Sequence, residues 1–226
     1  MNSKKNFTNN IRSNLLTFDF INNLLDLFKK ITFQNILEKI RYKKMLSQKN
    51  ITKKFVTIYK ENLWSSKESK SGEGSQLNQT RNLSKWLVEN FKKLNIRLFV
   101  DAPCGDLNWM SKILVKLDVK YIGIDIVPQI IKKNKKIFES KKIKFEVKNI
   151  CKDKLPDCDL IMVRDCLFHL SYIDIDKFFR NLNKTKYKYL LTTTHIGSNI
   201  HNCDIISGDF RLFNLFAHPF NFKKKK

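Results

Sequence analysis

The sequence predicts an α/β fold, a doubly wound and mostly parallel sheet that follows an N-terminal helical extension. Two short apolar runs, Leu98–Asp101 and 121–127, are separated by a segment of helix length, and parallel strands need such a crossover. A third run, 160–163, is apolar throughout, as is typical of a central strand that is covered on both faces. A chain of 226 residues suits one domain and an appendage.

The first 50 residues form the expected extension. Apolar residues recur there at helical spacing and predict one or two amphipathic helices, with residues 43–54 as a linker to the sheet domain at 51–226. Such helices could cap the sheet domain or form a dimer contact, and the alternative is a basic amphipathic helix in peripheral contact with a membrane surface. The apolar positions are Ile21, Leu24, Leu25, Phe28, Ile31, Ile36, Leu37 and Ile40.

Residues 63–75 are too rich in Gly and Ser for regular structure and predict a long loop. Loops of this length are binding loops, lids or disordered segments. A helix at 77–94 follows, with Trp86, Leu87 and Phe91 on one face. Because this helix leads into the first strand, the loop is expected to fold over a ligand bound at the sheet edge.

The turn after Leu98–Asp101 favours one kind of ligand. Gly105 and Asp125 are about 20 residues apart, the spacing at which an acid that ends the second strand bonds a ribose. A dinucleotide site needs several glycines, but Pro103 and Leu107 stand where further glycines would be, and Asp106 would repel phosphate. The turn therefore predicts a ligand with a ribose and no phosphate.

At these residues the chain resembles the class I S-adenosylmethionine-dependent methyltransferases, whose first motif reads acid-apolar-Gly-x-Gly-x-Gly. It is more similar to a bacterial subgroup with the motifs D-A-P-C-G-D-x-N-W-M and R-D-x-L-x-H-L, which tolerates Pro103 and Leu107. The resemblance implies a Rossmann-like sheet with strand order 3-2-1-4-5 and S-adenosyl-L-methionine as cofactor. The alternative is a Rossmann-like domain that binds another nucleotide or none.

Further elements complete the expected sheet. They are a helix at 128–140, a strand at Ile143–Val147, a turn at 155–159 before the strand at 160–163, and a strand at 187–193, after which residues 202–222 look irregular. Class I enzymes usually finish with antiparallel strands, and only four lysines follow Phe222. The last antiparallel strand is therefore expected to be missing, which leaves an open sheet edge that favours pairing with another chain.

Candidate site residues follow from the strand ends and from the resemblance. Asp165 and His169 are one helical turn apart, so a histidine beside a carboxylate is expected to act as general base, unless His169 is a buried histidine bonded to backbone. His195 is a third catalytic candidate, and Asp209, Arg211 and Asn214 are expected on the acceptor side. The residues expected to bind the cofactor are Asp101, Pro103, Cys104, Gly105, Asp106, Trp109, Asp125, Ile126, Asn149, Ile150 and Arg164.

Composition limits the partners. The formal net charge of +23 favours polyanions, but only seven of the 44 basic residues are Arg, so a nucleic-acid partner is not favoured, although charge does not exclude it. The five cysteines form no C-x-x-C pair, which argues against zinc, any other metal site or a disulfide framework and favours a reducing cytoplasm. No apolar run is long enough to span a bilayer.

These observations predict a methyltransferase that acts on a small acceptor. Resemblance to the subgroup implies a sugar or sugar phosphate of surface-polysaccharide biosynthesis as the acceptor. RNA methylation is an alternative that only the charge supports. A catalytically silent cofactor-binding module is another, because two glycines of the turn are replaced and the chain ends early.

Overall fold

The computed structural model describes residues 27, 31–32, 34–197 and 199–223. Contacts divide the chain into two units, Met1–Lys44 and Met45–Lys226. In the first unit residues 34–44 are helical, and the expected apolar positions Ile21, Leu24, Leu25 and Phe28 lie outside the described residues. The sheet and the candidate site belong to the second unit.

The sheet has five parallel strands in the order β3-β2-β1-β4-β5, so the expected doubly wound sheet is confirmed. Asp101 lies opposite Gly123 on one side and Met162 on the other, which brings the carboxyl ends of the three central strands to one edge. In the described residues after β5 no further strand occurs. The strands are β1 (Leu98–Asp101), β2 (Lys120–Asp125), β3 (Ile143–Val147), β4 (Cys158–Val163) and β5 (Tyr187–Thr192).

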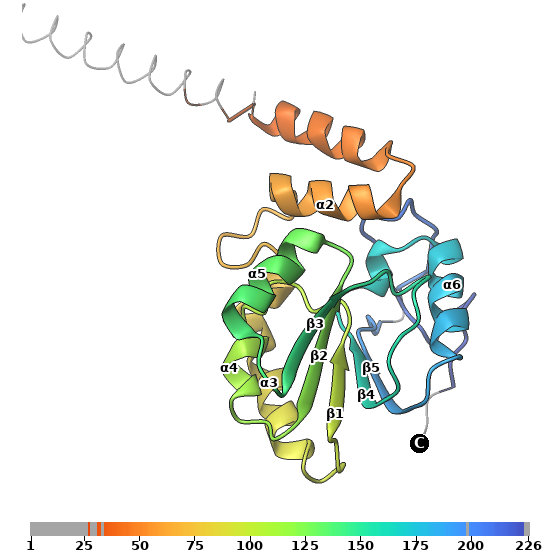
Figure 1. Ribbon diagram of the computed structural model, residues 1–226. Helices are drawn as coiled ribbons and strands as arrows, with labels where there is room; N and C mark the ends of the chain where they lie inside the picture. Colours follow the sequence, from red (N-terminus) through yellow and green to blue (C-terminus); the bar gives the residue numbers. More distant parts are fainter. Residues whose placement is uncertain (1–26, 28–30, 33, 198, 224–226) are drawn as a thin grey trace, which may run out of the picture. The chain divides into compact units, whose positions relative to one another are not determined.

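Helices cover both faces of the sheet (Figure 1). One core cluster packs α3 (Leu77–Asn90), α4 (Met110–Leu114) and α5 (Pro128–Phe138) on one face, around Phe99, Tyr121 and Phe145. The other packs α6 (Tyr172–Leu182) on the opposite face, around Val100, Ile161 and Phe178. Because β1 and β4 are buried from both sides, their ends are held firmly. None of the helices within the described ranges is both long enough and apolar enough to cross a membrane.

The expected linker at 43–54 is wrong, because helix α2 (Ile51–Glu61) begins within it. The Asn50 side chain accepts a hydrogen bond from the backbone N–H of Lys53 at 3.0 Å and caps the first turn. The helix ends at Asn62, whose φ of 49° places it in the left-handed region. Figure 1 shows α2 crossing above the upper end of the sheet.

Three other expectations need correction. Trp86 does not share the buried face of α3: it is 44% exposed, while Leu87 and Phe91 are buried. The strand β4 starts at Cys158, inside the expected turn. Helix α6 was not expected, although Ser171 provides an ordinary N-cap by accepting from the backbone N–H of Asp174.

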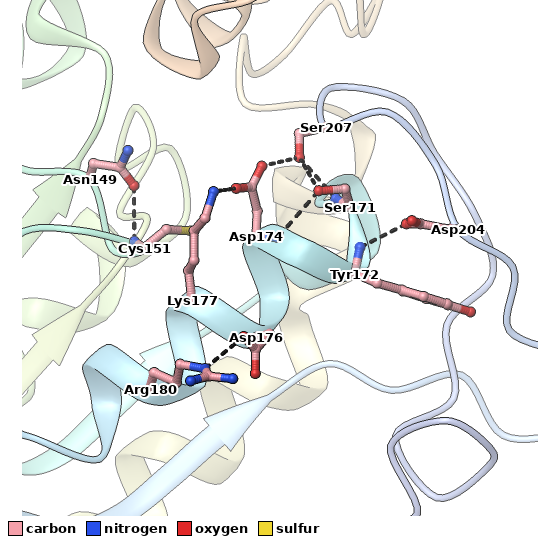
Figure 2. Close-up of polar contacts among 10 residues, drawn as sticks. All are labelled: Asn149, Cys151, Ser171, Tyr172, Asp174, Asp176, Lys177, Arg180, Asp204 and Ser207. Carbon is pink, nitrogen blue, oxygen red and sulfur yellow. Dashed lines mark hydrogen bonds and ion pairs between the residues drawn. The ribbon is translucent and has the colours of Figure 1, made fainter.

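The C-terminal segment is irregular, as expected, and it is fastened to the start of α6 (Figure 2). The Ser207 hydroxyl donates to the Asp174 carboxylate at 2.6 Å and accepts from the backbone N–H of Ser171 at 2.9 Å. The backbone N–H of Tyr172 donates to the Asp204 carboxylate at 2.7 Å. These bonds fix the position of residues 204–208 and of the backbone that follows them.

Candidate functional site

A pocket opens beyond the carboxyl ends of β1, β2 and β4, and its empty space is about 990 Å³ including the mouth. Its walls come from the sheet edge, from α2 and from the loop that follows α2. Most of the expected site residues line it: Asp101, Pro103, Cys104, Gly105, Trp109, Asp125, Ile126, Asn149, Ile150, Arg164, Asp165 and His169. Five expected residues do not line it: Asp106, His195, Asp209, Arg211 and Asn214.

Asp125, at the end of β2, is buried and held by backbone. Its Oδ2 accepts from the N–H of Gly105 at 3.1 Å, and its Oδ1 accepts from the N–H of Val127 at 2.9 Å. Burial raises the pKa of Asp125 to about 6, against the lowering effect of these N–H donors. Above that pH the carboxylate is charged and oriented, and each oxygen keeps a lone pair for a ligand hydroxyl.

The turn between β1 and α4 requires left-handed backbone at two positions. Gly105 has a φ of +56°, and a Cβ there would collide with the Ser71 hydroxyl. Leu107 adopts a φ of 57° although it is not glycine, and its side chain is buried. The turn therefore has a glycine-like course even where the sequence lacks the expected glycine.

Asp101, at the end of β1, is the second buried carboxylate of the pocket. Its Oδ2 accepts a hydrogen bond from the hydroxyl of Tyr121 at 2.9 Å. Burial raises the pKa of Asp101 to about 7, and the Tyr121 bond and the nearby charge of Arg164 oppose that rise. A cationic ligand beside this group would favour its charged form.

Residues 66–76, here called the strap, lie against the turn. The Ser69 hydroxyl and the backbone N–H of Lys70 both donate to the Asp106 carboxylate, at 2.9 Å each for the shortest contacts. The backbone N–H of Asp106 in turn donates to the Ser71 hydroxyl at 2.9 Å. Asp106 thus holds the strap, whereas the sequence predicted that it contacts the cofactor.

Arg164 anchors the strap from the other side. Its Nη2 donates to the carbonyl of Gly74 at 2.7 Å and forms an ion pair with Asp165 at 2.8 Å. A Cβ on Gly74 would lie 2.5 Å from Asp165 Oδ2, so a larger residue there would displace that carboxylate. The Thr193 hydroxyl also donates to Asp165 at 2.8 Å. The Asp165 carboxylate is therefore bound to Arg164 and Thr193, and His169 has a different partner.

That partner is the backbone carbonyl of Asp209, which lies 2.8 Å from Nδ1 of His169. A carbonyl oxygen can only accept, so Nδ1 carries the hydrogen and Nε2 keeps its lone pair. Burial lowers the pKa of His169 below its ordinary value of 6.5. The ring is stacked on Trp64 with centroids 5.0 Å apart and an interplanar angle of 27°. The imidazole is thus neutral at neutral pH and fixed in orientation.

The remaining candidates make contacts away from the pocket. His195 accepts at Nδ1 from the backbone N–H of Phe213 at 3.0 Å. Arg211 is buried between two rings, with its guanidinium carbon 5.0 Å from the Tyr172 centroid and 5.2 Å from that of Phe213. The backbone N–H of Asn214 donates to Asn202. The C-terminal segment thus acts on the pocket through the backbone carbonyl of Asp209, which orients the His169 ring.

Sequence reasoning missed the wall formed by α2. Ile51, Phe55 and Tyr59 are spaced four residues apart, so they share one helix face, and all three line the pocket together with Trp64. The four-residue repeat after the Asn50 cap was a usable signal for the helix. Nothing in the repeat shows which part of the sheet domain the face covers.

No family model matches the chain, and no curated protein sequence matches it. Among solved structures, human N-acetylserotonin methyltransferase in complex with S-adenosylmethionine matches with 18% identity and a TM-score of 0.42, over 61% of this chain and 40% of that one. The small RNA methyltransferase HEN1 matches with 16% identity and a TM-score of 0.44, over 51% of this chain and 16% of that one. The methyltransferase domain of bacterial CtHen1-C matches with 19% identity and a TM-score of 0.44, over 55% of this chain and 72% of that one. The chain thus spans less than half the length of the first two.

Proposed function

We propose that the protein is an S-adenosyl-L-methionine-dependent methyltransferase that acts on a small acceptor. The observation that carries the proposal is the Asp125 carboxylate, held by the backbone N–H groups of Gly105 and Val127 at the edge of the pocket. A carboxylate in this place suits the two hydroxyls of a ribose. Because Asp101 also lines the pocket, a phosphate group would meet two buried carboxyl groups there.

The residues present fit this cofactor. Asp125 would accept from the ribose hydroxyls, and Ile126 and Ile150 provide apolar surface for an adenine ring. The side-chain oxygen of Asn149 accepts from the backbone N–H of Cys151 at 2.9 Å (Figure 2), so one lone pair remains for the adenine amino group. Asp101 lies where an ammonium group of the amino-acid end would be stabilised. When bound, the cofactor supplies an electrophilic methyl group on a sulfonium cation.

His169 is the proposed general base. Its Nδ1 is occupied by the Asp209 carbonyl, so Nε2 can take the proton of an acceptor hydroxyl. The lowered pKa keeps this nitrogen unprotonated at neutral pH. Asp165 has a positioning role: it holds Arg164, which holds the strap at Gly74.

Calorimetry with the full chain tests the cofactor assignment. S-adenosylmethionine and S-adenosylhomocysteine should each bind once per chain, and NAD should not bind, because its pyrophosphate would lie at the turn after β1, beside the Asp101 carboxyl group. Binding of NAD that equals or exceeds that of S-adenosylmethionine would contradict the proposal. Absence of any binding by S-adenosylmethionine would do the same.

Two acceptors stay predictions: a sugar or sugar phosphate, from the sequence resemblance, and RNA, from the net charge of +23. Incubation of cell extract with methyl-labelled cofactor, followed by identification of the labelled product, separates them. A silent module would bind the cofactor and yield no labelled product. We also propose a reducing cytoplasm, which is supported by five cysteines of which none is bonded to another.

A further inference from the structure

We infer that the acceptor is a small uncharged molecule in which an aromatic ring carries a hydroxyl group, and that it binds against the wall formed by Trp64 and His169. The inference rests on the proposed methyl transfer and specifies the substrate class of that site. It is argued from the composition of one wall, from the charges around the pocket and from the cover over it.

The wall opposite the sheet edge is aromatic. Phe55 and Tyr59 project from one face of α2, and Trp64 follows the helix and stacks on His169. The rings of Phe55 and Trp64 meet edge to face with centroids 6.4 Å apart. Leu170 adds apolar surface beside His169. Stacked and edge-to-face partners of this kind stabilise an aromatic guest beyond its buried area.

Within the described residues, two of the three Lys or Arg side chains that line the pocket are held in ion pairs, although the chain has a net charge of +23. Of the basic side chains that line it, Arg164 is paired with Asp165, and Lys148 forms an ion pair with Glu146 at 2.6 Å. Lys70 lies over the Tyr59 ring, 5.4 Å from its centroid. Among the described lining residues, Arg164 and Lys148 are therefore ion-paired and Lys70 lies at Tyr59, while the buried carboxyl groups of Asp101 and Asp125 face the same space. A phosphate or carboxylate placed beside His169 would have to compete with Asp165 for Arg164.

The cover over the pocket restricts the size of the acceptor. Helix α2 supplies one side of it, and the strap is fastened at Asp106 and at Arg164. A polymer such as RNA could reach His169 only by displacing α2 or by breaking those bonds. A single ring needs neither change.

A hydroxyl group suits the lone pair on Nε2 of His169, which lies beside the aromatic wall. The acceptor oxygen forms a bond to the methyl carbon as the carbon–sulfur bond breaks, and sulfur keeps that electron pair as a neutral thioether. The hydroxyl proton passes to Nε2 of His169 and from there to water. Atoms and charge balance without a further reactant.

The first experiment compares matched acceptors with the full chain and methyl-labelled S-adenosylmethionine. 4-Methylphenol and 4-hydroxybenzoate share the ring and the hydroxyl and differ in a methyl group against a carboxylate. We expect kcat/KM for 4-methylphenol to be about tenfold higher or more, because the carboxylate must be desolvated in a pocket where Arg164 is already paired with Asp165. Glucose 1-phosphate and poly(U) should receive no label.

The outcomes separate this inference from the proposed function. Labelling of glucose 1-phosphate or poly(U) but not of 4-methylphenol would overturn the aromatic acceptor and leave methyl transfer intact. If S-adenosylmethionine binds and none of the four probes is labelled, the aromatic acceptor is contradicted as well. If S-adenosylmethionine does not bind, both proposals fail.

The second experiment tests the aromatic wall. Trp64→Ala should raise KM for 4-methylphenol about tenfold and leave the Kd of S-adenosylhomocysteine nearly unchanged, and Trp64→Phe should restore most of the loss. Trp86→Ala is the matched control, since Trp86 is 44% exposed on α3 and should change neither constant. An equal rise in KM and in the Kd for S-adenosylhomocysteine with Trp64→Ala would indicate a structural role only and would overturn the placement of the acceptor against Trp64.

Discussion

The two ends of the pocket are held by different kinds of contact. At the end assigned to the cofactor, Asp101 and Asp125 terminate adjacent strands of one βαβ unit, and Asp125 is fixed by backbone N–H groups. At the end assigned to the acceptor, Trp64 stacks on His169, which is bonded to a carbonyl 40 residues further along the chain. The first end depends on the sheet, and the second depends on segments that meet only in the folded chain.

This difference has a functional meaning. An end fixed by backbone hydrogen bonds tolerates side-chain changes nearby, because its geometry comes from the strands themselves. An end assembled from rings and loops can change its shape by substitution at a few positions. The first arrangement suits a cofactor that is constant, and the second suits an acceptor that differs between proteins.

The largest expected effect is on turnover at the acceptor end. His169→Gln should lower kcat by roughly 10²- to 10⁴-fold, because the proton acceptor is lost, and should leave the Kd of S-adenosylmethionine unchanged. Discontinuous assays with labelled cofactor, quenched at several times, give kcat, and calorimetry gives Kd. His201→Gln, at an exposed position, is the control and should behave as wild type.

The pH dependence of kcat tests the same role of His169 as general base. Because burial lowers the pKa of His169, kcat at saturating cofactor should fall only as pH drops below 6.5 and should be level above about pH 7. In His169→Gln this acid limb should disappear. A limb that persists unchanged in the variant would belong to another group of the pocket, such as Asp125 or Asp101, and would contradict the assignment of the limb to His169.

At the cofactor end, Asp125→Ala should weaken S-adenosylmethionine binding by roughly 10²- to 10³-fold, since two hydrogen bonds to a charged group are lost. Calorimetry on the two proteins measures the change. Asp176→Ala, which removes an exposed carboxylate paired with Arg180 on α6, should bind as wild type does. Equal affinity in wild type and Asp125→Ala would remove the ribose assignment and with it the contrast between the two ends.

A smaller effect is expected where the strap joins the two ends. Asp106→Ala removes the acceptor for the Ser69 hydroxyl and the Lys70 N–H, so the strap should open more often. Trypsin should then cut after Lys67 and Lys70 faster than in wild type, and cofactor affinity should fall about tenfold. Asp118→Ala, at an exposed ion pair with Lys142, is the control. Unchanged cleavage in Asp106→Ala would show that the strap is held elsewhere.

The smallest effect concerns stability. The pKa of Asp101 is raised from 3.8 to about 7 in the folded protein, so the folded state holds this proton more tightly than the unfolded state. Its contribution to the free energy of unfolding is therefore present at low pH and is lost as pH rises from about 4 to about 7. In urea unfolding, the drop in stability between about pH 5 and about pH 8 should be smaller in Asp101→Asn than in wild type. An equal drop in both proteins would contradict the raised pKa.

The sequence was sufficient for the strands and the turn around Gly105 and Asp125 because their signals are local. The strand Ile143–Val147 has the expected bounds, and Asp101 and Asp125 end adjacent strands as the βαβ pattern predicted. Asp106 was predicted to bind the cofactor because it lies in the motif, and its contact with Ser69, 37 residues away, leaves no local pattern. The Asp209 carbonyl could not be found either, since a backbone group carries no sequence signal.

Helix α2 uses adjacent faces for two tasks. Ile58 is buried and packs against Gly208 of the C-terminal segment. A Cβ on Gly208 would approach Met45 and Ile58, so the helix and this segment are closely packed. Phe55 lies on the face that lines the pocket. Under the proposed function, substitution at positions 51 and 55 would change the acceptor wall while Ile58 keeps the helix in place. Acceptor scope would then be adjustable from a segment upstream of the strands that carry Asp101 and Asp125.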